Sequence, residues 1–273
     1  MKPLLELKAV SVSFDGFLAL NDLNLALAPG ELRAVIGPNG AGKTTFLDVI
    51  TGKVKPTRGD VCFRGQSLLG ISEHRIARLG IGRKFQTPRV YQNLTPRRNL
   101  ELAVKGSHSP FTLLLGRLNA DQRDRVQELL AVVGLEANAS RPAGSLSHGQ
   151  KQWLEIAMLL AQDPDLLLVD EPVAGLSDEE TERTGALLRQ LAGDHTVLVI
   201  EHDMDFIREL DCPVTVLHEG HVLCEGSMDV VQRDPRVIEV YLGVEDEEVS
   251  AGATSAVATS AVASDSGSHQ EIT

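Results

Sequence analysis

The fold of this chain is decided by the stretch Gly37-Pro38-Asn39-Gly40-Ala41-Gly42-Lys43-Thr44-Thr45, in which Gly37 to Thr44 fit the pattern G-x-x-x-x-G-K-[ST] in full. An apolar run typical of a buried strand, Leu32–Ile36, comes before it, and apolar residues with helical spacing follow it until about Gly52. Glycines let the backbone curl so that successive N–H groups point at phosphate oxygens, and the following helix adds positive potential at the same place. The sequence therefore predicts a strand, a phosphate-binding loop and a helix.

Two side chains of this loop suit a bound nucleoside triphosphate. Lys43 would reach the β- and γ-phosphates, and the Thr44 hydroxyl would ligate Mg²⁺. An accidental glycine-rich turn is the alternative, but such a turn does not require a strand before it and a helix after it.

A pair of acids follows another apolar run farther along the chain. Leu166–Val169 has the composition of a buried parallel strand, and Asp170 and Glu171 come directly after it. An aspartate in this place can hold Mg²⁺, directly or through water, and a glutamate one residue on faces the other way, toward an attacking water. The alternative is a pair of helix-capping acids before Pro172. Because the chain also has a phosphate loop, we interpret Asp170 as a metal ligand and Glu171 as the general base or water-positioning residue.

The composition is that of a folded protein without the features of a nucleic-acid binder. The 273 residues are 42% hydrophobic and 23% charged but only 4% aromatic, and the formal net charge is −12. Positive surfaces and aromatic stacking platforms are the usual means of binding nucleic acid, so we expect no nucleic-acid partner. Residues 245–273 contain acids, Ala, Ser and Thr without Lys, Arg or periodicity, which predicts a disordered tail.

Cysteine use and the length of the apolar runs bear on the compartment. Cys62, Cys212 and Cys224 are odd in number and far apart in sequence, which argues against a disulfide framework or zinc site and indicates a reducing compartment. The start of the chain does not resemble a signal peptide, because Glu6 interrupts its short apolar stretch. The apolar runs are too short to cross a bilayer. If the protein serves a membrane, we expect it to dock onto other chains that span it.

Hydrophobic periodicity predicts an α/β chain. Further segments alternate like strands or are continuously apolar: Leu5–Val12, Leu23–Leu27, Val197–Ile200, and Val214–Leu217 with Val222–Glu225, which flank the turn Glu219-Gly220. Residues 72–164 are expected to be mostly helical, with an amphipathic helix over Asp121–Val133. Another helix is expected over Asp178–Leu191, between the two continuously apolar strands.

The segment Leu146-Ser147-His148-Gly149-Gln150 lies between the phosphate loop and the acidic strand. Through this segment the chain resembles the ABC-type ATPases, whose signature sequence is normally L-S-G-G-Q. L-S-H-G-Q, as found here, is familiar among importers of branched-chain amino acids and their relatives. Ser147 and the backbone N–H groups around Gly149 and Gln150 would lie at the start of a helix, where anions bind. In this family, that anion site contacts the γ-phosphate bound by the partner subunit. An ordinary capped helix start is the alternative.

The resemblance extends to other positions, in the order in which the family has them. It implies that Phe14 stacks on adenine, that Gln86 touches Mg²⁺ and hinges a helical subdomain, and that His202 senses the γ-phosphate. Considered alone, Phe14 could be a strand core residue, and an isolated histidine is more often structural. Ser177 stands where the family usually has Asp, which leaves the usual carboxylate contact across the dimer in doubt.

The resemblance also implies a fold, an activity and an assembly. Residues 1–244 would form one ABC ATPase domain, an α/β P-loop NTPase core with an antiparallel β subdomain and a helical subdomain at about residues 87–164. The implied activity is ATP hydrolysis, with ATP and Mg²⁺, coupled to transport. Two ATPase chains, either two copies of this one or this one and a relative, would sandwich ATP. They would bind transmembrane permease subunits at the cytoplasmic face of the inner membrane, with a substrate-binding protein as an indirect partner.

Within the family, several stretches most resemble the urea-importer ATPases, among them Gly82-Arg-Lys-Phe-Gln86 and Asp234-Pro-Arg-Val-Ile-Glu-Val-Tyr-Leu-Gly243. This resemblance predicts import of urea or a short amide. The alternative is the same role in a branched-chain amino-acid importer. A non-transport ABC ATPase is a further alternative, although such proteins usually carry two cassettes or a long coiled-coil insert. The signature segment and the lack of an N-K-x-D motif argue against a GTPase or a small-molecule kinase.

Four titratable residues have no assigned role in this interpretation. His218 and His221 flank a turn and are expected to face solvent, because no third metal ligand is near them in sequence. Arg83 and Lys84 come shortly before Gln86 and are expected to face a partner or solvent.

Overall fold

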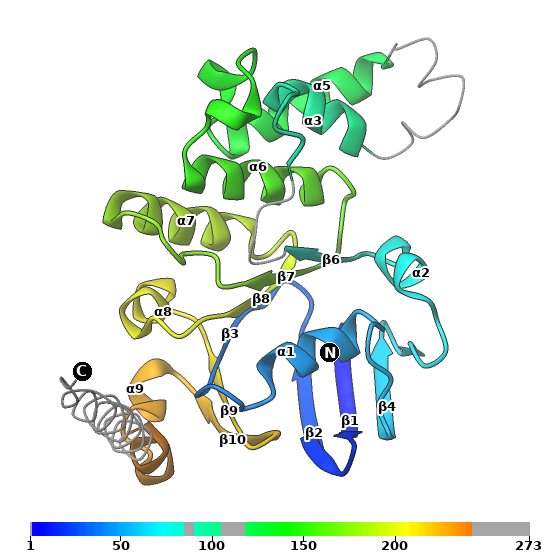
Figure 1. Cartoon of the computed structure of the whole chain (residues 1–273), viewed down its shortest axis with the longest axis vertical. Helices are drawn as coiled ribbons and strands as arrows, with labels where there is room; N and C mark the ends of the chain where they lie inside the picture. Colours follow the sequence, from blue (N-terminus) through cyan, green and yellow to red (C-terminus); the bar gives the residue numbers. More distant parts are fainter. Residues whose placement is uncertain (1, 85–89, 105–117, 242–273) are drawn as a thin grey trace, which may run out of the picture.

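The computed structural model describes residues 2–84, 90–104 and 118–241. Gln86 and the predicted tail 245–273 lie outside these residues. A central sheet separates a group of helices at one end of the molecule from an antiparallel sheet at the other (Figure 1).

The central sheet has six strands in the order β10-β9-β3-β8-β7-β6. Its strands are β3 (Leu32–Ile36), β6 (Ile81–Lys84), β7 (Leu166–Asp170), β8 (Thr196–Ile200), β9 (Val214–His218) and β10 (His221–Gly226). All pairings are parallel except that of β10, which returns antiparallel to β9 as the predicted hairpin. Because parallel strands end at the same edge, the segments that follow β3, β7 and β8 meet there.

Side chains on opposite faces of this sheet belong to two separate cores. On one face, Leu167 and Val169 of β7 join a core built with the helices α6 (His148–Leu160), α7 (Asp178–Leu191) and α8 (Met204–Leu210). On the other face, Leu166 and Leu168 join a core built with α1 (Lys43–Ile50) and the antiparallel sheet. Both faces of β7 and β8 are therefore buried, which explains why these strands are continuously apolar in sequence.

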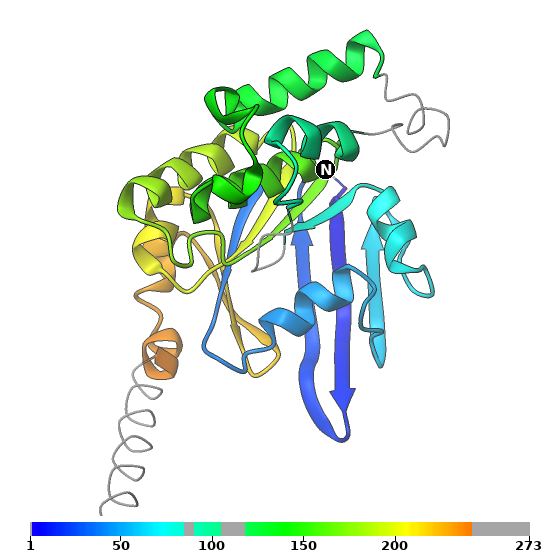
Figure 2. The same cartoon turned by 45° about the horizontal axis from the view of Figure 1, so that its top comes forward.

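The antiparallel sheet has the order β2-β1-β4-β5. Its strands are β1 (Leu5–Phe14), β2 (Phe17–Leu27), β4 (Arg58–Phe63) and β5 (Gln66–Ser67). It packs beside α1, as the two views in Figures 1 and 2 show. The short helix α2 (Glu73–Arg78) then leads the chain back to the central sheet at β6.

Three helices form the end of the molecule opposite the antiparallel sheet. α3 (Pro96–Ala103), α5 (Ala120–Val132) and α6 pack on one another, and α6 also packs against β6 of the central sheet, while α7 packs on α8 (Figures 1 and 2). The last short helix, α9 (Met228–Val231), follows β10. No helix among the residues named above as described is long and apolar enough to span a membrane.

The prediction that residues 72–164 are mostly helical was wrong at β6. This strand has the sequence Ile-Gly-Arg-Lys and lacks the apolar pattern of a buried strand, so its local sequence does not favour it. It forms because it pairs with β7 at the edge of the sheet. The expectation that Arg83 and Lys84 face a partner or solvent was also wrong, since Lys84 is 0% exposed and the Arg83 side chain is 8% exposed.

Candidate functional site

The phosphate loop lies between β3 and α1, as predicted from the sequence. Gly42, the last residue before α1, has φ 100°, and a Cβ atom there would come within 2.5 Å of the Ala19 carbonyl oxygen, so only glycine fits. Gly40 has φ 82° with open space beside it. The loop residues range from buried to exposed: Gly37 and Ala41 are buried, Pro38, Gly42, Lys43 and Thr45 are half-buried, and Asn39, Gly40 and Thr44 are exposed.

Lys43 folds back over this loop. Its Nζ donates hydrogen bonds to the carbonyl oxygens of Gly37 at 2.5 Å and of Pro38 at 2.9 Å. Burial lowers the pKa of Lys43, while the negative charges of Glu171 and Asp170 oppose that shift. The loop lysine and both predicted acids are therefore close enough to interact electrostatically.

Asp170 ends β7 and is buried. Burial raises the pKa of Asp170, and Arg83 opposes the rise by its positive charge and a hydrogen bond. Arg83 Nη2 lies 3.3 Å from Asp170 Oδ2, and Arg83 Nη1 lies 2.5 Å from Asp48 Oδ1. Since Asp48 belongs to α1, one guanidinium joins the helix after the phosphate loop to the carboxylate predicted to hold the metal.

Glu171 has an unusual backbone conformation. Its φ is 45°, in the left-handed region that residues other than glycine rarely adopt, and its N–H donates to the Ile200 carbonyl oxygen at 2.9 Å. Backbone strain of this kind concentrates at functional sites, where the surrounding structure holds it. The Glu171 side chain is 29% exposed, so its carboxylate is accessible at the edge where the parallel strands end.

A third acid at this edge, Glu201, was missed by the sequence analysis. It follows β8 directly, as Asp170 and Glu171 follow the apolar run of β7, and that position was the signal that could have revealed it. Glu201 is 1% exposed. The imidazole of the neighbouring His202 is 68% exposed, and its Nδ1 lies 3.7 Å from Glu201 Oε2 and 3.8 Å from Glu171 Oε1.

The signature segment forms the start of α6. Ser147 is the N-cap, and it makes a capping box with Gln150, so a capped helix start and the signature interpretation apply to the same residues. Ser147 Oγ also donates to Glu180 Oε1 of α7 at 2.8 Å. A Cβ atom on Gly149 would come within 2.7 Å of the Glu180 carboxyl carbon, so the absence of a side chain there makes room for this carboxylate.

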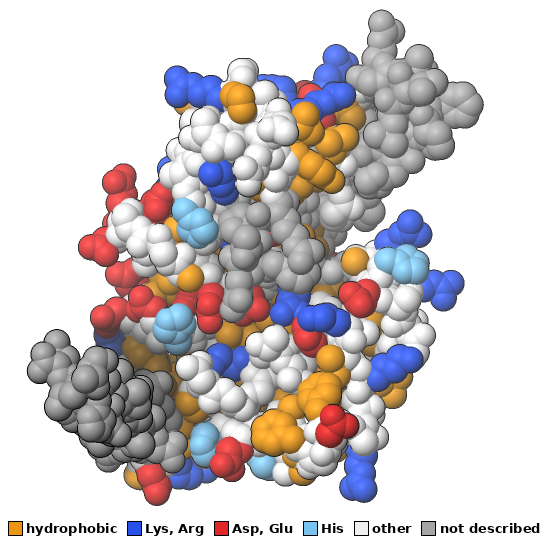
Figure 3. Space-filling model, viewed as in Figure 1, with side chains coloured by type: hydrophobic (Ala, Val, Ile, Leu, Met, Phe, Trp, Pro, Cys, Tyr) orange, Lys and Arg blue, Asp and Glu red, His pale blue; other side chains and the backbone are white. Residues whose placement is uncertain are grey.

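Two further positions singled out in the sequence, Phe14 and His221, are exposed. Phe14, at the end of β1, is 46% exposed, so it is not the strand core residue that was considered as an alternative. It lies near Phe17 and Leu18 in sequence, both also exposed. Figure 3 shows hydrophobic side chains at the surface over the antiparallel sheet, the part of the chain to which these residues belong. His221 is exposed, with Nδ1 2.9 Å from the Glu219 carbonyl oxygen.

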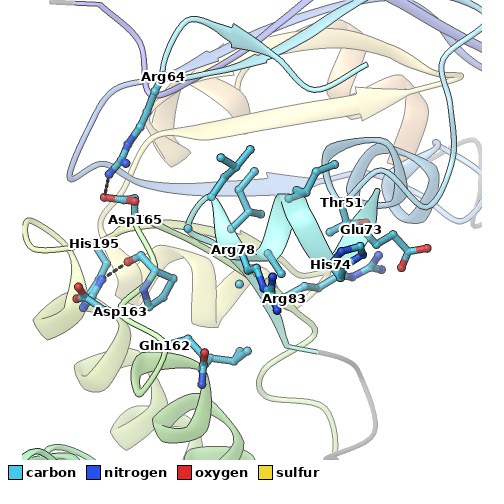
Figure 4. A pocket seen from close by; sticks show the side chains of 18 of the residues that line it. Thr51, Arg64, Glu73, His74, Arg78, Arg83, Gln162, Asp163, Asp165 and His195 are labelled. Carbon is cyan, nitrogen blue, oxygen red and sulfur yellow. Dashed lines mark hydrogen bonds and ion pairs between the residues drawn. The ribbon is translucent and has the colours of Figure 1, made fainter. Parts of the chain in front are cut away.

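A cavity of about 1070 Å³ opens at the opposite edge of the sheet (Figure 4). Its lining includes Gly80, Asp165 and His195, which lie just before β6, β7 and β8. Arg64 forms an ion pair with Asp165, and His195 Nδ1 lies 2.6 Å from the Pro164 carbonyl oxygen. The cavity is therefore distinct from the phosphate loop, although Arg83 also lines it.

The donor atoms at the carboxyl edge suit Mg²⁺. Thr44 presents a hydroxyl and Asp170 a carboxylate, both hard oxygen ligands. Within the described part of the chain, no group of three or more His, Cys, Asp or Glu gathers as a metal cage. Mg²⁺ at phosphate sites is usually held by one or two protein ligands together with the phosphates, so a sparse ligand set fits it.

A phosphate loop after β3, an acid pair after β7 and a Ser-capped signature helix define the class of ABC-type P-loop ATPases. A family model described as "ABC transporter" matches residues 20–174, and one described as "Branched-chain amino acid ATP-binding cassette transporter" matches residues 221–247. The chain belongs to the ABC transporter family, as an ATP-binding subunit. It binds ATP and is an ATPase whose hydrolysis is coupled to transport, as predicted.

Relatives and solved structures agree with this family. The chain is 37% identical over 251 residues to the high-affinity branched-chain amino acid transport ATP-binding protein LivG of Escherichia coli (strain K12), covering 89% of this chain and 98% of LivG. Its fold is similar to the ADP conformation of MJ1267, an ATP-binding cassette of an ABC transporter, with a TM-score of 0.77, 29% identity, and coverage of 89% of this chain and 100% of that one. It is also similar to a dimeric structure of MJ0796, a bacterial ABC transporter cassette, with a TM-score of 0.67, 28% identity, and coverage of 82% and 98%. The predicted fold class is confirmed.

Proposed function

We propose that this chain is the ATPase subunit of an importer of branched-chain amino acids. The observation that carries the proposal is the match of residues 221–247 to the branched-chain family model, and the similarity to LivG over nearly its whole length supports it. The prediction of urea or a short amide rested on shorter stretches of resemblance. These relatives favour the branched-chain alternative, and urea remains as one outcome of the test.

In the proposed site, Gly37–Thr45 binds the triphosphate and Phe14 stacks on adenine. Lys43 exchanges its bonds to the loop carbonyls for bonds to the β- and γ-phosphates. Thr44, Asp170 and Gln86 would hold Mg²⁺, which when bound neutralises charge on the phosphates.

The hydrolytic step is assigned to the residues after β7 and β8. Glu171 orients the attacking water from its accessible position at the sheet edge, and His202 contacts the γ-phosphate. The proximity of His202 Nδ1 to Glu171 supports a shared role, since both can face one phosphate.

The assembly that we infer is a dimer with two shared sites. Ser147, Gly149 and Gln150 of one ATPase chain complete the site formed by the phosphate loop of the other, and Ser147 exchanges its bond to Glu180 for one to the γ-phosphate. The second chain is a copy of this one or a related ATPase. ATP binding closes the dimer, hydrolysis by water breaks the bond between ADP and the γ-phosphate, and release of that phosphate removes the charge that holds the dimer closed.

The dimer would act at the cytoplasmic face of the membrane, where it moves permease subunits. We place their docking near Gln86, shortly after β6. The substrate-binding protein delivers the amino acid from the other side and does not contact this chain. The transported molecule never enters the ATPase, so its identity must be measured with the whole transporter.

The test is uptake of labelled leucine and labelled urea, each at low concentration, in a strain that lacks this gene. Leucine uptake should be lost, and a plasmid with the wild-type gene should restore it. A plasmid with Lys43→Ala should not, because the variant loses the charged hydrogen bonds to the phosphates, each worth about 1.5–3 kcal/mol. Loss of urea uptake with leucine uptake intact would assign the chain to a urea importer, and loss of neither would overturn both substrates.

A further inference from the structure

Glu201 is a buried carboxylate in the middle of the proposed site. It follows β8, which lies between β3 with its phosphate loop and β7 with its acid pair. Its side chain is 1% exposed, and its N–H donates to the Val35 carbonyl oxygen of β3 at 3.3 Å. A carboxylate removed from water in this way is costly unless donors surround it.

The two oxygens of this carboxylate bind two different loops. Glu201 Oε1 accepts a hydrogen bond from the Val173 N–H at 3.0 Å, and Oε2 accepts one from the His202 N–H at 3.0 Å. Val173 is two residues after Glu171, so the loop that carries Glu171 and the loop that carries His202 share one anchor. Burial raises the pKa of Glu201, and the backbone N–H groups oppose the rise.

We propose that Glu201 is a positioning residue for ATP hydrolysis. It holds the Glu171 loop and the His202 loop in one fixed arrangement, so that the carboxylate and the imidazole face the same γ-phosphate. This inference rests on the proposed roles of Glu171 and His202. Misplacement of a reacting group by about 1 Å can cost about a hundredfold in rate, so an anchor shared by both groups is expected to affect turnover.

The chemistry of the anchor predicts which substitution breaks it. A carboxylate accepts at both oxygens, whereas the amide of Glu201→Gln accepts at one and presents an NH₂ group at the other. That NH₂ group would face the N–H of Val173 or of His202, and one of the two bonds would be lost. Loss of the Val173 bond would release the loop that carries Glu171, and loss of the His202 bond would release the backbone of His202, so Glu201→Gln disturbs one of the two groups while it keeps the size of the side chain.

The experiment compares Glu201→Gln with Glu171→Gln and with the double variant, in the ATPase chain purified with its transporter subunits. For Glu201→Gln, kcat should fall on the order of tenfold to a hundredfold. The affinity for a fluorescent ATP analogue should stay within about twofold, because the hydrogen bonds of Glu201 go to Val35, Val173 and His202 rather than to the phosphate loop. In the Glu171→Gln background, Glu201→Gln should add little further loss, since it acts through the same groups.

Glu31→Gln is the matched control. Glu31 Oε2 accepts from the Ala28 N–H at 2.7 Å, and its Oε1 pairs with Arg33, so Glu31→Gln also weakens contacts of both carboxylate oxygens. These contacts lie before β3 and away from the acid pair after the apolar run of β7, so kcat should be unchanged. An unchanged kcat in Glu201→Gln, a fully additive loss in the double variant, or an equal loss in Glu31→Gln would overturn the positioning role alone. Near-normal turnover in Glu171→Gln would overturn both this role and the proposed catalytic role of Glu171.

Discussion

One guanidinium joins two acidic side chains beside the nucleotide site. Arg83 binds Asp48 of α1 and Asp170 at the end of β7, and all three side chains are nearly buried. Lys53 also pairs with Asp48, at 3.0 Å, so Asp170 depends more on Arg83 than Asp48 does. The charge of Arg83 therefore favours the ionised form of the proposed metal ligand and opposes the rise in its pKa that burial causes.

Arg83→Met removes this charge and preserves much of the side-chain volume. Removing one partner of a buried ion pair typically costs about 3–5 kcal/mol, so the free energy of unfolding should fall by about that amount. Binding of ATP should become less dependent on Mg²⁺, because Asp170 is more readily protonated. Urea denaturation and ATP titrations with and without Mg²⁺ measure the two effects.

Arg64→Met provides the control for Arg83→Met. Arg64 pairs with Asp165 at the opposite edge of the sheet, with its side chain 56% exposed. Exposed pairs contribute up to about 1 kcal/mol, so this variant should lose little stability and keep the Mg²⁺ dependence. Equal effects of the two substitutions would contradict the role assigned to Arg83.

Among the residues that the structure describes, three helices begin with a capping box. A capping box joins the N-cap and the N3 residue of α5 (Asn119 with Gln122), of α6 (Ser147 with Gln150) and of α7 (Ser177 with Glu180). Glu180 serves α7 as a capping residue and also accepts the Ser147 hydroxyl at the start of α6. The starts of α6 and α7 are thus coupled, which links the signature segment to Ser177.

Ser177→Ala removes the N-cap of α7 and should destabilise the chain by about 1 kcal/mol, while Ser177→Asp keeps a capping oxygen and should not. The substitution leaves the Glu180 N–H without its acceptor and loosens the first turn of α7, which carries the Glu180 carboxylate, so Ser177→Ala should change ATPase activity in the assembled complex. Asn119→Ala, which removes the corresponding cap of α5, should cost similar stability without that change. If Ser177→Ala and Ser177→Asp both leave activity unchanged, the position does not couple the two helices.

At the scale of the whole molecule, the chain presents two separate parts of the proposed nucleotide site. The phosphate loop, the acids and His202 meet at the carboxyl edge of the central sheet, whereas the contacts of Ser147 and Gly149 are made with Glu180 of α7. In the proposed assembly a second ATPase chain brings its signature segment to this edge. The similarity to a dimeric ABC transporter cassette supports that arrangement.

Glu171→Gln should trap this dimer in its closed state. The substitution keeps the shape of the side chain and removes its charge and basicity, so hydrolysis should slow by on the order of 10²–10⁴-fold while ATP still binds. Size-exclusion chromatography with and without Mg-ATP should show the dimer only with Mg-ATP, for the isolated subunit or for the co-expressed ATPase pair. Asp170→Asn should form less of it, because its metal site is damaged. Unchanged turnover of Glu171→Gln would exclude this residue as the base.

The local pattern of the sequence was sufficient for the elements that the phosphate site needs. The glycines of Gly37–Thr45 indicated a loop between a strand and a helix, and the helix predicted over Asp178–Leu191 has those bounds as α7. Glycine conformations, capping residues and hydrophobic periods act over a few neighbouring residues, so they can be read along the chain. The class of protein and its ATPase activity were instead implied by the resemblance of residues 146–150 to the ABC signature sequence.

Only the tertiary structure decided which charges meet. β6 has no strand pattern of its own, and its pairing with β7 buries Lys84 and brings Arg83 to Asp170. Glu201 becomes an anchor because the sheet order places β8 between β3 and β7. Contacts of this kind depend on strand order and on the approach of segments far apart in sequence, and no local propensity encodes either.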